Sequence, residues 1–453
     1  MTVSIIVLAA GQGTRMRSQL PKVLQPLAGR PLLDHVLDTA QALDPRRLLV
    51  VHGHGADAVR ETCDRDGVDW VLQAEQLGTG HAVDQAMPEV SDEDIVLVLY
   101  GDVPLITRTS LDALLAATSD STLGLLTIEL DDPAGYGRIL RNTQGRIERI
   151  VEHKDATDKE RDIREINTGL LAAPAEKMKR WLRSLDNRNA QGEYYLTDII
   201  AMSVAEGMEV VGVAAQSAAE VHGINDRSQL AAAEAMYRER QAQALMQQGV
   251  HLLDPARIDI RGELSCGLDV QVDVNVVFEG KVTLADGVRI GPNCVLRDVT
   301  VGKNTVIDAF SHIESADIGK SCSIGPYARL RPGSLLKDDV KVGNFVEIKK
   351  SELARGAKVN HLTYIGDASI GEVVNIGAGT ITCNYDGVNK HRTVIEDGAF
   401  IGSNASLVAP VRVGRNATVG AGSVISKDVG DDALAVTRAR QSEIADWQRP
   451  TKK

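Results

Sequence analysis

Several familiar nucleotide-binding and membrane-targeting patterns are missing from this chain of 453 residues. The N-terminal stretch LAAGQGTRM has neither the GxxxxGK[ST] spacing of a P-loop nor the third glycine of GxGxxG. No apolar run approaches the ~18 residues that span a bilayer, and no basic region precedes the first apolar stretch. We therefore expect no secretory signal and no membrane partner.

Cysteine is scarce, and positive charge is outnumbered. The five cysteines form no CxxC pair, which argues against a disulfide framework and a zinc knuckle and favours a reducing cytoplasm. The formal net charge of −12 disfavours general nucleic-acid binding, because a phosphate backbone attracts Lys and Arg. We expect small-molecule substrates and no nucleic acid, although local basic clusters could hold a small anion.

The chain is too long for one core, and its two halves are patterned differently. Residues 1–227 alternate apolar runs such as SIIVLAAG and IVLVLYGD with amphipathic stretches such as PLLDHVLDTAQAL. This alternation predicts an α/β domain with a mostly parallel sheet covered by helices. Residues 228–248 contain neither Gly nor Pro and are rich in Ala, Glu, Gln and Arg, so they are predicted to form a linker helix.

Residues 249–453 carry a six-residue repeat, which predicts a second domain. Aliphatic residues recur at this spacing, as at Ile318, Ile324 and Leu330, and many of them, such as Ile318 and Ile324, precede glycine. A hexapeptide repeat is the signature of a parallel β-helix, in which three hexads make one coil of about 18 residues. The repeat breaks once badly, between Ile376 and Ile401, and an insertion of this length usually maps to a binding face.

The repeat also separates the cysteines. Cys294 and Cys322 stand two positions before an aliphatic residue, where the repeat places small or β-branched residues, so both are predicted to pack in the core. Cys383 lies in the insertion, where it could line a site or pack. No histidine adjoins it in the sequence, which disfavours a nucleophile.

Three polar residues of the repeat suggest a site. Arg331 and Lys349 are 18 residues apart and should stack on successive coils, about 4.8 Å apart. Two stacked cations repel, so they form either a solvated basic ridge or a phosphate clamp. His361 is expected near the same level, either as a surface histidine or as a general base. A zinc site like that of a γ-carbonic anhydrase would need three histidines, and the spacing of His312, His361 and His391 suggests no such ligand set.

Eleven motifs occur in one order over the whole chain: LAAGQGTRM with PKVL, LQAEQLGTGHA, YGDVPL, GYGRI, VEHKDAT, INTG, RLRPG, NFVEIKK, HLTYIGD, NIGAGTITCNYDG and IGSN. In these the sequence closely resembles the family of bifunctional bacterial N-acetylglucosamine-1-phosphate uridylyltransferases / glucosamine-1-phosphate acetyltransferases. The first motif alone would mark only a sugar nucleotidyltransferase. The insertion motif and HLTYIGD make the resemblance specific for the bifunctional family.

The resemblance implies a Rossmann-like nucleotidyltransferase domain that transfers UMP from UTP to N-acetylglucosamine-1-phosphate with Mg²⁺ and releases pyrophosphate. It assigns the metal to Asp102 and Asn225. Asp226 departs from the asparagine that is more usual beside this ligand, which puts metal affinity in question. The matching UTP and sugar-nucleotide positions are Leu8, Ala9, Ala10, Gly11, Arg15, Lys22, Gln73, Gly78, Thr79, Tyr100, Gly101, Asp102, Gly137, Glu152, Asn167 and Asn225.

For the second domain the resemblance implies a left-handed β-helix that acetylates glucosamine-1-phosphate with acetyl-CoA, in a cytoplasmic homotrimer. His361 matches the catalytic base. Arg331, Lys349, Tyr364 and Asn375 match the sugar-phosphate contacts. The acetyl-CoA positions are Ala378, Asn384, Tyr385, Ser403, Ala421 and Arg438. The product, UDP-N-acetylglucosamine, would feed peptidoglycan and lipopolysaccharide precursor synthesis.

Two other interpretations remain open at this stage. A sugar nucleotidyltransferase could carry a β-helix that serves only assembly or regulation, and a nucleotide-exchange subunit could use both folds as a scaffold without catalysis. Neither explains the position of His361 beside the stacked cations, nor the NYDG insertion.

Overall fold

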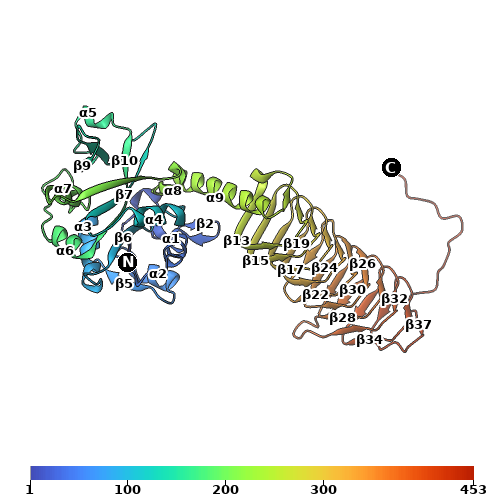
Figure 1. Cartoon of the computed structure of the whole chain (residues 1–453). Coiled ribbons are helices and arrows are strands. Elements are labelled where there is room, and N and C mark those ends of the chain that lie inside the picture. The colour runs from blue at the N-terminus through green and yellow to red at the C-terminus, as the bar shows by residue number, and fades with distance from the viewer. Residues whose placement is uncertain (1, 453) are drawn as a thin grey trace. The chain divides into compact units, whose positions relative to one another are not determined.

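The computed structural model describes residues 2–452, which form two compact units, one ending at Tyr237 and the other beginning at Arg238 (Figure 1). Among the described residues, no helix combines the length and the apolar character needed to cross a bilayer.

The first unit is built on a nine-stranded sheet. Its main strands are β1 (Val3–Ala9), β4 (Arg47–His52), β5 (Asp69–Leu72), β6 (Ile95–Tyr100), β7 (Thr122–Glu129), β10 (Glu165–Pro174) and β11 (Glu209–Ala214). Their order is β11-β7-β10-β6-β1-β4-β5, and β10 runs antiparallel to both of its neighbours. Two further strands, β8 (Arg138–Arg141) and β9 (Ile147–Val151), extend this sheet as an antiparallel pair.

Helices cover both faces of this sheet, and the sequence of β1 shows why. Ile6 and Leu8 pack into one hydrophobic cluster, whereas Ile5 and Val7 pack into another. A strand buried on both faces presents a continuous apolar run instead of an alternating one. The helices are α1 (Leu32–Gln41), α2 (Ala56–Cys63), α3 (Thr79–Ala86), α4 (Arg108–Ala116), α5 (Asp158–Arg161), α6 (Ala175–Arg183), α7 (Asp198–Ala205) and α8 (Ala218–Val221). Short elements complete the unit: η1 (Thr14–Met16), η2 (Lys22–Leu24), η3 (Met87–Glu89), β2 (Pro26–Leu27) and β3 (Arg30–Pro31).

The helix α9 (Arg227–Gln247) begins in the first unit and ends in the second. Leu230 and Ala233 of its first half pack in a cluster of the first unit. Ala242 and Leu245 of its second half join the core of the second unit. The two halves of this one helix are therefore buried by different cores.

The second unit is a solenoid of short parallel strands. They are β12 (His251–Leu252), β13 (Ile258–Cys266), β14 (Gln271–Val272), β15 (Val276–Leu284), β16 (Arg289–Ile290), β17 (Val295–Val301), β18 (Val306–Ile307), β19 (His312–Ile318), β20 (Ser323–Ile324), β21 (Arg329–Leu330), β22 (Ser334–Leu336), β23 (Lys341–Asn344), β24 (Glu347–Lys349), β25 (Glu352–Leu353), β26 (Lys358–His361), β27 (Tyr364–Gly366), β28 (Ala368–Ile370), β29 (Asn375–Ile376), β30 (Ile381–Cys383), β31 (Thr393–Ile395), β32 (Phe400–Ile401), β33 (Ser406–Val408), β34 (Val411–Val413), β35 (Thr418–Val419), β36 (Val424–Ile425) and β37 (Leu434–Ala435). A short helix, η4 (Pro255–Arg257), precedes β13.

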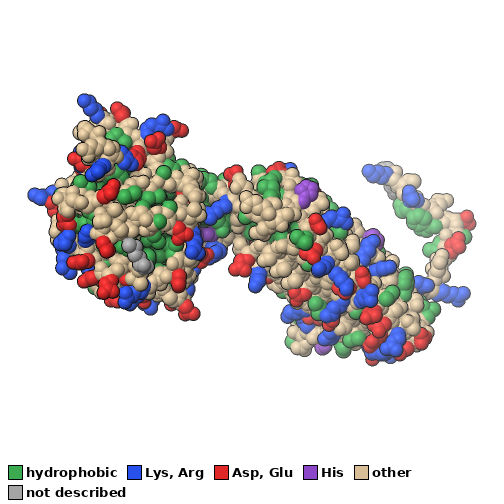
Figure 2. Space-filling model, viewed as in Figure 1, with side chains coloured by type: hydrophobic (Ala, Val, Ile, Leu, Met, Phe, Trp, Pro, Cys, Tyr) green, Lys and Arg blue, Asp and Glu red, His purple; other side chains and the backbone are tan. Residues whose placement is uncertain are grey.

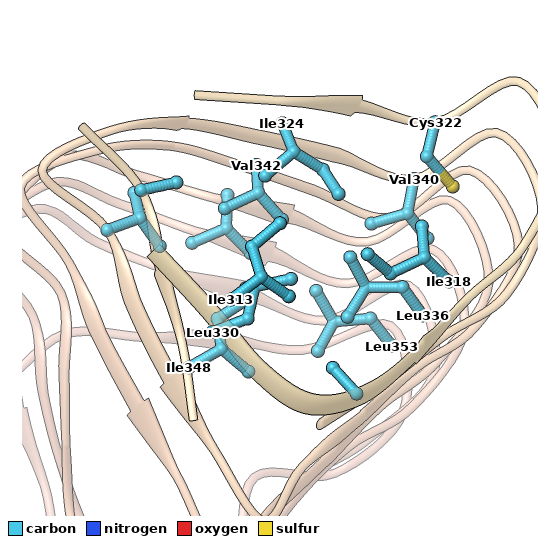
Figure 3. Close-up of a cluster of buried hydrophobic side chains, with 14 of the residues drawn as sticks. Ile313, Ile318, Cys322, Ile324, Leu330, Leu336, Val340, Val342, Ile348 and Leu353 are labelled. Carbon is cyan, nitrogen blue, oxygen red and sulfur yellow. The ribbon is translucent and has the colours of Figure 1, made fainter. Parts of the chain in front are cut away.

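Each coil stacks on the next in the register that the repeat predicts. Leu330 pairs with Ile348, 18 residues later, and Ile348 pairs with Ile365. The repeated aliphatic residues are almost completely buried and fill the inside of the solenoid, as Figure 3 shows for Ile324, Leu330 and Ile348 among others. The predicted fold class, a Rossmann-like α/β domain followed by a left-handed parallel β-helix, is confirmed.

The β-helix buries two cysteines in its core and exposes charged side chains on its outer surface. Cys294 and Cys322 are buried in the β-helix core, which confirms their predicted packing role. All five cysteines lie among the described residues, and all are free. Acidic and basic side chains are interspersed on the visible outer face of this unit (Figure 2).

One corner of the β-helix carries exposed aromatic side chains. Phe310, Tyr327 and Phe345 occupy equivalent positions with φ of 59°, 56° and 55°. Their rings stack with centroids 5.0 and 5.2 Å apart and are about half exposed. Leu362 follows at the same corner, with φ of 48° and 65% exposure. We call these four residues the corner stack.

The insertion is shorter than the sequence indicates. The repeat seemed to break from Ile376 to Ile401, but β30 and β31 continue the coil within that range and pair with the neighbouring coils. Thr382 is buried in register with Leu407, so a threonine stands where the repeat usually has an aliphatic residue. In β31 the repeat is intact, since Ile395 is buried in register with Ile370. Only residues 384–392 lie between the two strands.

Candidate functional sites

A cavity of about 520 Å³ opens in the first unit where β1 and β6 end. The carboxyl ends of parallel strands are where α/β sheets bind ligands, because the connections there diverge and leave a crevice. Ten of the predicted nucleotide residues line it: Leu8, Ala9, Ala10, Gly11, Lys22, Gln73, Gly78, Thr79, Tyr100 and Asp102. The lining also contains residues that the sequence did not single out, namely Gln12, Val23, Gln76, Ala82 and Glu193.

The glycines around this cavity have different roles. A Cβ at Gly11 would meet no atom within 4 Å, so this part of the loop leaves open space for a ligand beside the backbone. A Cβ at Gly101 would lie 3.1 Å from Leu33, so Gly101 serves packing behind the cavity. Gly78 has a φ of 117°, and its Cβ would lie 2.6 Å from the backbone oxygen of Tyr194. The turn into α3 therefore requires glycine at this position.

The side-chain oxygens of Asp102 and Asn225 converge on the ammonium group of Lys22 beside the cavity. The Lys22 ammonium forms an ion pair with Asp102 and lies 3.2 Å from Oδ1 of Asn225. The side chains of Lys22 and Asp102 are only 14% and 15% exposed. Oxygens of a carboxylate and an amide suit Mg²⁺, which usually takes one or two protein carboxylates and completes its shell with water and substrate phosphate. The residues therefore fit the metal that the family resemblance implies.

Asp226 has a structural task next to this group. Its Oδ1 accepts the backbone N–H of Gln229 at 2.9 Å, which caps the start of α9. The Oε1 of Gln229 in turn accepts the backbone N–H of Asn225 at 2.7 Å. This reciprocal cap fixes the backbone that carries Asn225, and it engages the carboxylate of Asp226 in the helix terminus.

Three of the remaining predicted residues form a second group at the edge of the sheet. The backbone N–H of Asn167 donates to the carbonyl of Gly137 at 2.9 Å. A Cβ on Gly137 would lie 3.5 Å from the carboxylate of Glu152, which accepts a hydrogen bond from Thr197 at 3.0 Å. Burial raises the pKa of Glu152 above its ordinary value, and the hydrogen bond from Thr197 opposes that shift. Arg15 lies in η1 with an exposed side chain.

On the β-helix, His361 is oriented by a residue that sequence reasoning missed. Its Nδ1 lies 2.8 Å from Oδ1 of Asn344, one coil earlier and in direct register. An amide oxygen only accepts, so Nδ1 carries the proton and Nε2 keeps a lone pair. His361 is exposed. The signal for Asn344 was available in the sequence, because it stands 17 residues before His361, close to one coil length.

Four of the predicted acetyl-CoA residues follow His361 along one edge of the solenoid, which we call the ligand edge: Ala378, Ser403, Ala421 and Arg438. Backbone hydrogen bonds link successive coils there: Gly379 donates to His361, Asn404 to Ala378 and Gly422 to Ser403. A guanidinium nitrogen of Arg438 then donates to the carbonyl of Ala421 at 2.9 Å. The ligand edge therefore presents an exposed imidazole near one end and a cation at the other.

Arg331 and Lys349 stack in register as predicted, but both are paired with carboxylates. Arg331 lies 2.9 Å from Glu347, and Lys349 lies 3.9 Å from Asp367. The neighbouring ammonium of Lys390 and burial lower the pKa of Lys349, while Asp367 opposes the shift. Part of the expected repulsion is thus relieved within the chain. The structure favours neither the basic ridge nor the phosphate clamp by this contact alone.

The insertion lies over this cation pair. Asn384 is buried and donates to Asp367, and Lys390 stands 5.9 Å above the ring of Tyr385. A cavity of about 350 Å³ lies here, and its lining includes Lys350, Lys390, His391 and Arg392. Basic residues thus continue outward from Lys349.

His361 and the cation pair lie at opposite ends of one face of the β-helix. Lys349 pairs with Gly366, five residues after His361 on the same coil, with the corner residue Leu362 and the strand β27 between them. Tyr364 projects from this strand, and its hydroxyl lies over Gly366, where an added Cβ would approach it to 2.3 Å. Asn375 stands in register with Lys358 of the coil that carries His361. A ligand touching both His361 and Lys349 would therefore lie across β27.

The described residues contain no group of three or more His, Cys, Asp and Glu side chains that could hold a metal ion. Asp102 and Asn225 do not conflict with this, because they are only two ligands and one of them is an amide.

Comparisons with known proteins relate these two sites to one family. Residues 5–156 match the model of the MobA-like NTP transferase domain, residues 260–354 the GMPPB C-terminal domain, and residues 392–427 the bacterial transferase hexapeptide with six repeats. A curated relative from Azoarcus sp. (strain BH72), named Bifunctional protein GlmU, is 60% identical over 99% of this chain and 100% of its own length. The protein of that name from Aromatoleum aromaticum is 58% identical over 100% of this chain and 99% of its own.

The chain belongs to the family of bifunctional GlmU proteins. A third member, from Methylococcus capsulatus, is 56% identical over 100% of this chain and 98% of its own. The predicted family membership is confirmed. The expectation of an enzyme that joins a nucleotidyltransferase to a hexapeptide-type acyltransferase is confirmed with it.

Proposed function

We propose that the two units perform consecutive reactions of UDP-N-acetylglucosamine synthesis. The second unit acetylates glucosamine-1-phosphate with acetyl-CoA, and the first transfers UMP from UTP to the N-acetylglucosamine-1-phosphate formed. In domain terms, residues 1–227 carry uridylyl transfer, residues 228–248 link, and residues 249–453 carry acetyl transfer. The observation that carries this proposal is that one chain has both the pairing of His361 with Asn344 on the β-helix and, in its other unit, a separate cavity that contains Lys22 and Asp102.

For uridylyl transfer, the chain supplies positioning and charge. Leu8 to Gly11 and Lys22 line the space for the triphosphate, and Gln73, Gly78 and Thr79 line the space for the nucleobase. Glu152 and Asn167, which belong to the second group, contact the sugar. Asp102 and Asn225 would hold Mg²⁺, and the metal would supply positive charge to neutralise the phosphates. The sugar-phosphate oxygen forms the new P–O bond as pyrophosphate leaves. No protein nucleophile is required.

For acetyl transfer, His361 acts as general base. The amine of glucosamine-1-phosphate loses its proton to Nε2 and attacks the thioester carbon, and the C–S bond then breaks to release the thiol of coenzyme A. Asn344 holds Nδ1–H, so the lone pair of Nε2 faces away from that bond. Arg331 and Lys349 hold the phosphate of this substrate, and Tyr364 and Asn375 contact its sugar. Acetyl-CoA follows the ligand edge from Ala378 toward Arg438. Asn384 and Tyr385 lie beside it.

The ion pairs of the basic residues do not conflict with a phosphate site. Lys350, Lys390 and Arg392 surround the neighbouring cavity. A dianionic phosphate would compete with Glu347 and Asp367 for Arg331 and Lys349, because charge-assisted bonds to phosphate are strong.

We also propose that the protein is a cytoplasmic homotrimer that feeds cell-wall and lipopolysaccharide precursor synthesis. The corner stack supports self-association: Phe310, Tyr327, Phe345 and Leu362 expose a continuous apolar row next to His361. Light scattering of the purified chain should give three times the monomer mass, and Tyr327→Asp should lower it. A monomeric wild-type protein with full acetyl transfer would remove the trimer from the proposal.

The deciding experiment measures the two activities separately. Thiol release from acetyl-CoA with glucosamine-1-phosphate reports the second unit, and pyrophosphate release from UTP with N-acetylglucosamine-1-phosphate reports the first. Uridylyl transfer without thiol release would favour the alternative in which the β-helix is purely structural. Failure of both would favour a non-catalytic role.

A further inference from the structure

The buried side-chain amide of Gln73, at the proposed nucleobase site, is held in one orientation by two neighbouring residues. Gln73 is 2% exposed and lies in the lining of the first-unit cavity. Its Nε2 lies 3.2 Å from the carbonyl oxygen of Gly78 and 3.0 Å from Nδ1 of His81. Both partners sit on the start of α3, where the Gly78 carbonyl also accepts the backbone N–H of Ala82 at 3.1 Å.

The Gly78 contact fixes which end of the amide is nitrogen. A backbone carbonyl only accepts hydrogen bonds, so the group facing it must be the NH₂ of Gln73. That NH₂ then donates its second proton to Nδ1 of His81, and the ring proton of a neutral imidazole stands on Nε2. The Nε2 of His81 lies 3.3 Å from the amide nitrogen Nε2 of Gln85. A hydrogen bond from the ring proton therefore requires the amide of Gln85 to rotate by 180° and present its oxygen.

Gln73 is therefore left with a defined role toward a ligand. Both protons of its NH₂ are engaged by the protein, and among residues 2–452 no hydrogen bond reaches Oε1. Oε1 is an acceptor that cannot be exchanged for a donor without breaking the bonds to Gly78 and His81. A uracil ring offers a donor at N3–H, whereas cytosine has a lone pair at N3 and would face Oε1 with acceptor against acceptor.

We propose that His81 is a positioning residue that locks Gln73 as an acceptor and thereby makes the site select pyrimidines with an N3–H over cytosine. This rests on the proposed uridylyl transfer. It deepens that function, because neither the cavity nor the family resemblance assigns a role to His81. Sites that would leave buried polar groups unpaired reject the wrong ligand far more strongly than apolar pockets do.

The test compares two substitutions of the same residue. His81→Phe keeps a ring of similar shape but has no acceptor. The amide of Gln73 then keeps only its bond to Gly78 and rotates by 180° more easily. His81→Asn places a carbonyl oxygen near the former Nδ1 and restores the acceptor. The ratio of kcat/KM for UTP to that for CTP should fall about 10-fold in the first variant and change less than about 3-fold in the second.

A matched nucleotide and a binding assay complete the design. 5-Methyluridine triphosphate keeps N3–H, so its turnover relative to UTP should be the same in wild type and both variants. Calorimetry with UDP and CDP should show the same loss of discrimination without catalysis. If His81→Phe does not fold, as judged by circular dichroism, His81→Leu carries the same prediction.

The outcomes separate the inference from the function on which it rests. Wild-type protein that forms no UDP-N-acetylglucosamine would overturn the proposed function. Wild-type preference for UTP that persists within about threefold in a folded His81→Phe or His81→Leu variant would overturn the role of His81 alone. Equal loss of discrimination in His81→Phe and His81→Asn would reduce His81 to a packing residue.

Discussion

The two candidate sites differ in the sequence separation of the residues that form them. In the first unit, Lys22 contacts Asp102 and Asn225, which lie 80 and 203 residues away. In the second, His361 contacts Asn344 at a separation of 17. The first site therefore depends on a complete α/β fold, whereas the second depends on the register of adjacent coils, since each coil of a solenoid contacts mainly its neighbours. A substitution in one unit should therefore reduce the activity of that unit and leave the other activity unchanged. The substitutions below test this, from the largest expected effect to the smallest.

The largest effect is expected for His361→Ala. General-base catalysis contributes about 10²- to 10⁴-fold, so acetyl transfer should fall within that range because nothing else at Nε2 accepts the amine proton. Uridylyl transfer should be unchanged. Steady-state kinetics with both substrates varied measures the loss, and near wild-type acetyl transfer between pH 6 and pH 9 would leave His361 as a surface residue.

Asp102→Asn tests the other site in the same way. A neutral amide is a weaker ligand for a hard cation, so uridylyl transfer should fall on the order of 10-fold or more and recover partly at high Mg²⁺. Acetyl transfer is the internal control. If a folded variant lost both activities equally, the independence of the two sites would be contradicted.

Asn344→Leu sharpens the comparison by breaking a contact between coils. Without its acceptor, Nδ1–H of His361 is no longer held, and acetyl transfer should fall by about 10-fold, mainly in kcat. Asn344→Asp retains an acceptor and should keep more activity. Loss of the cooperative melting transition in either variant would show that Asn344 supports the coil more than it supports the imidazole.

Lys22→Gln should separate metal affinity from turnover in the first unit. The Lys22 ammonium lies against both proposed metal ligands, and like charges compete for the same oxygens. Without nucleotide, the variant should bind Mn²⁺ several-fold more tightly, as measured by paramagnetic resonance. Its uridylyl transfer should nevertheless fall, because charge on the triphosphate is no longer neutralised. Unchanged or weaker Mn²⁺ binding would show that Lys22 does not compete with the metal.

The smallest effect concerns stability. Burial raises the pKa of Glu152 in the folded protein, so ionisation of this carboxyl costs more in the folded than in the unfolded state. The stability is highest below the unfolded pKa, near 4.3, and declines as pH rises through the folded pKa. Glu152→Gln should therefore raise the melting temperature slightly at pH 7 and not below pH 4. A melting temperature that rises equally at both pH values would exclude this electrostatic cause.

Sequence reasoning succeeded best where the fold repeats. The hexads placed Leu330, Ile348 and Ile365 on one interior column, and they stack in that order. The same counting would have found Asn344. It failed at β30, because Thr382 fills an inward position without an aliphatic side chain. It also missed β31, whose Ile395 is in the regular aliphatic position but follows the loop of residues 384–392.

The first unit was less predictable from residues alone. Its buried strands were recognisable, but the contact of Lys22 with Asn225 joins segments that no periodicity relates. That group was predicted through the family resemblance. The Gln73–His81 contact had no signal in the sequence at all, since it depends on the turn into α3.

Successive positions along the ligand edge are separated by one coil each, so their spacing is regular. Four coil-to-coil steps separate His361 from Arg438, and at about 4.8 Å per step they span roughly 19 Å. An elongated acyl donor anchored at Arg438 can bring its thioester to His361 only if its length matches that number of steps. Inserting or removing one complete coil between them would shift the reach by about 4.8 Å while leaving every coil internally unchanged, and so would retune the accepted donor length in fixed increments.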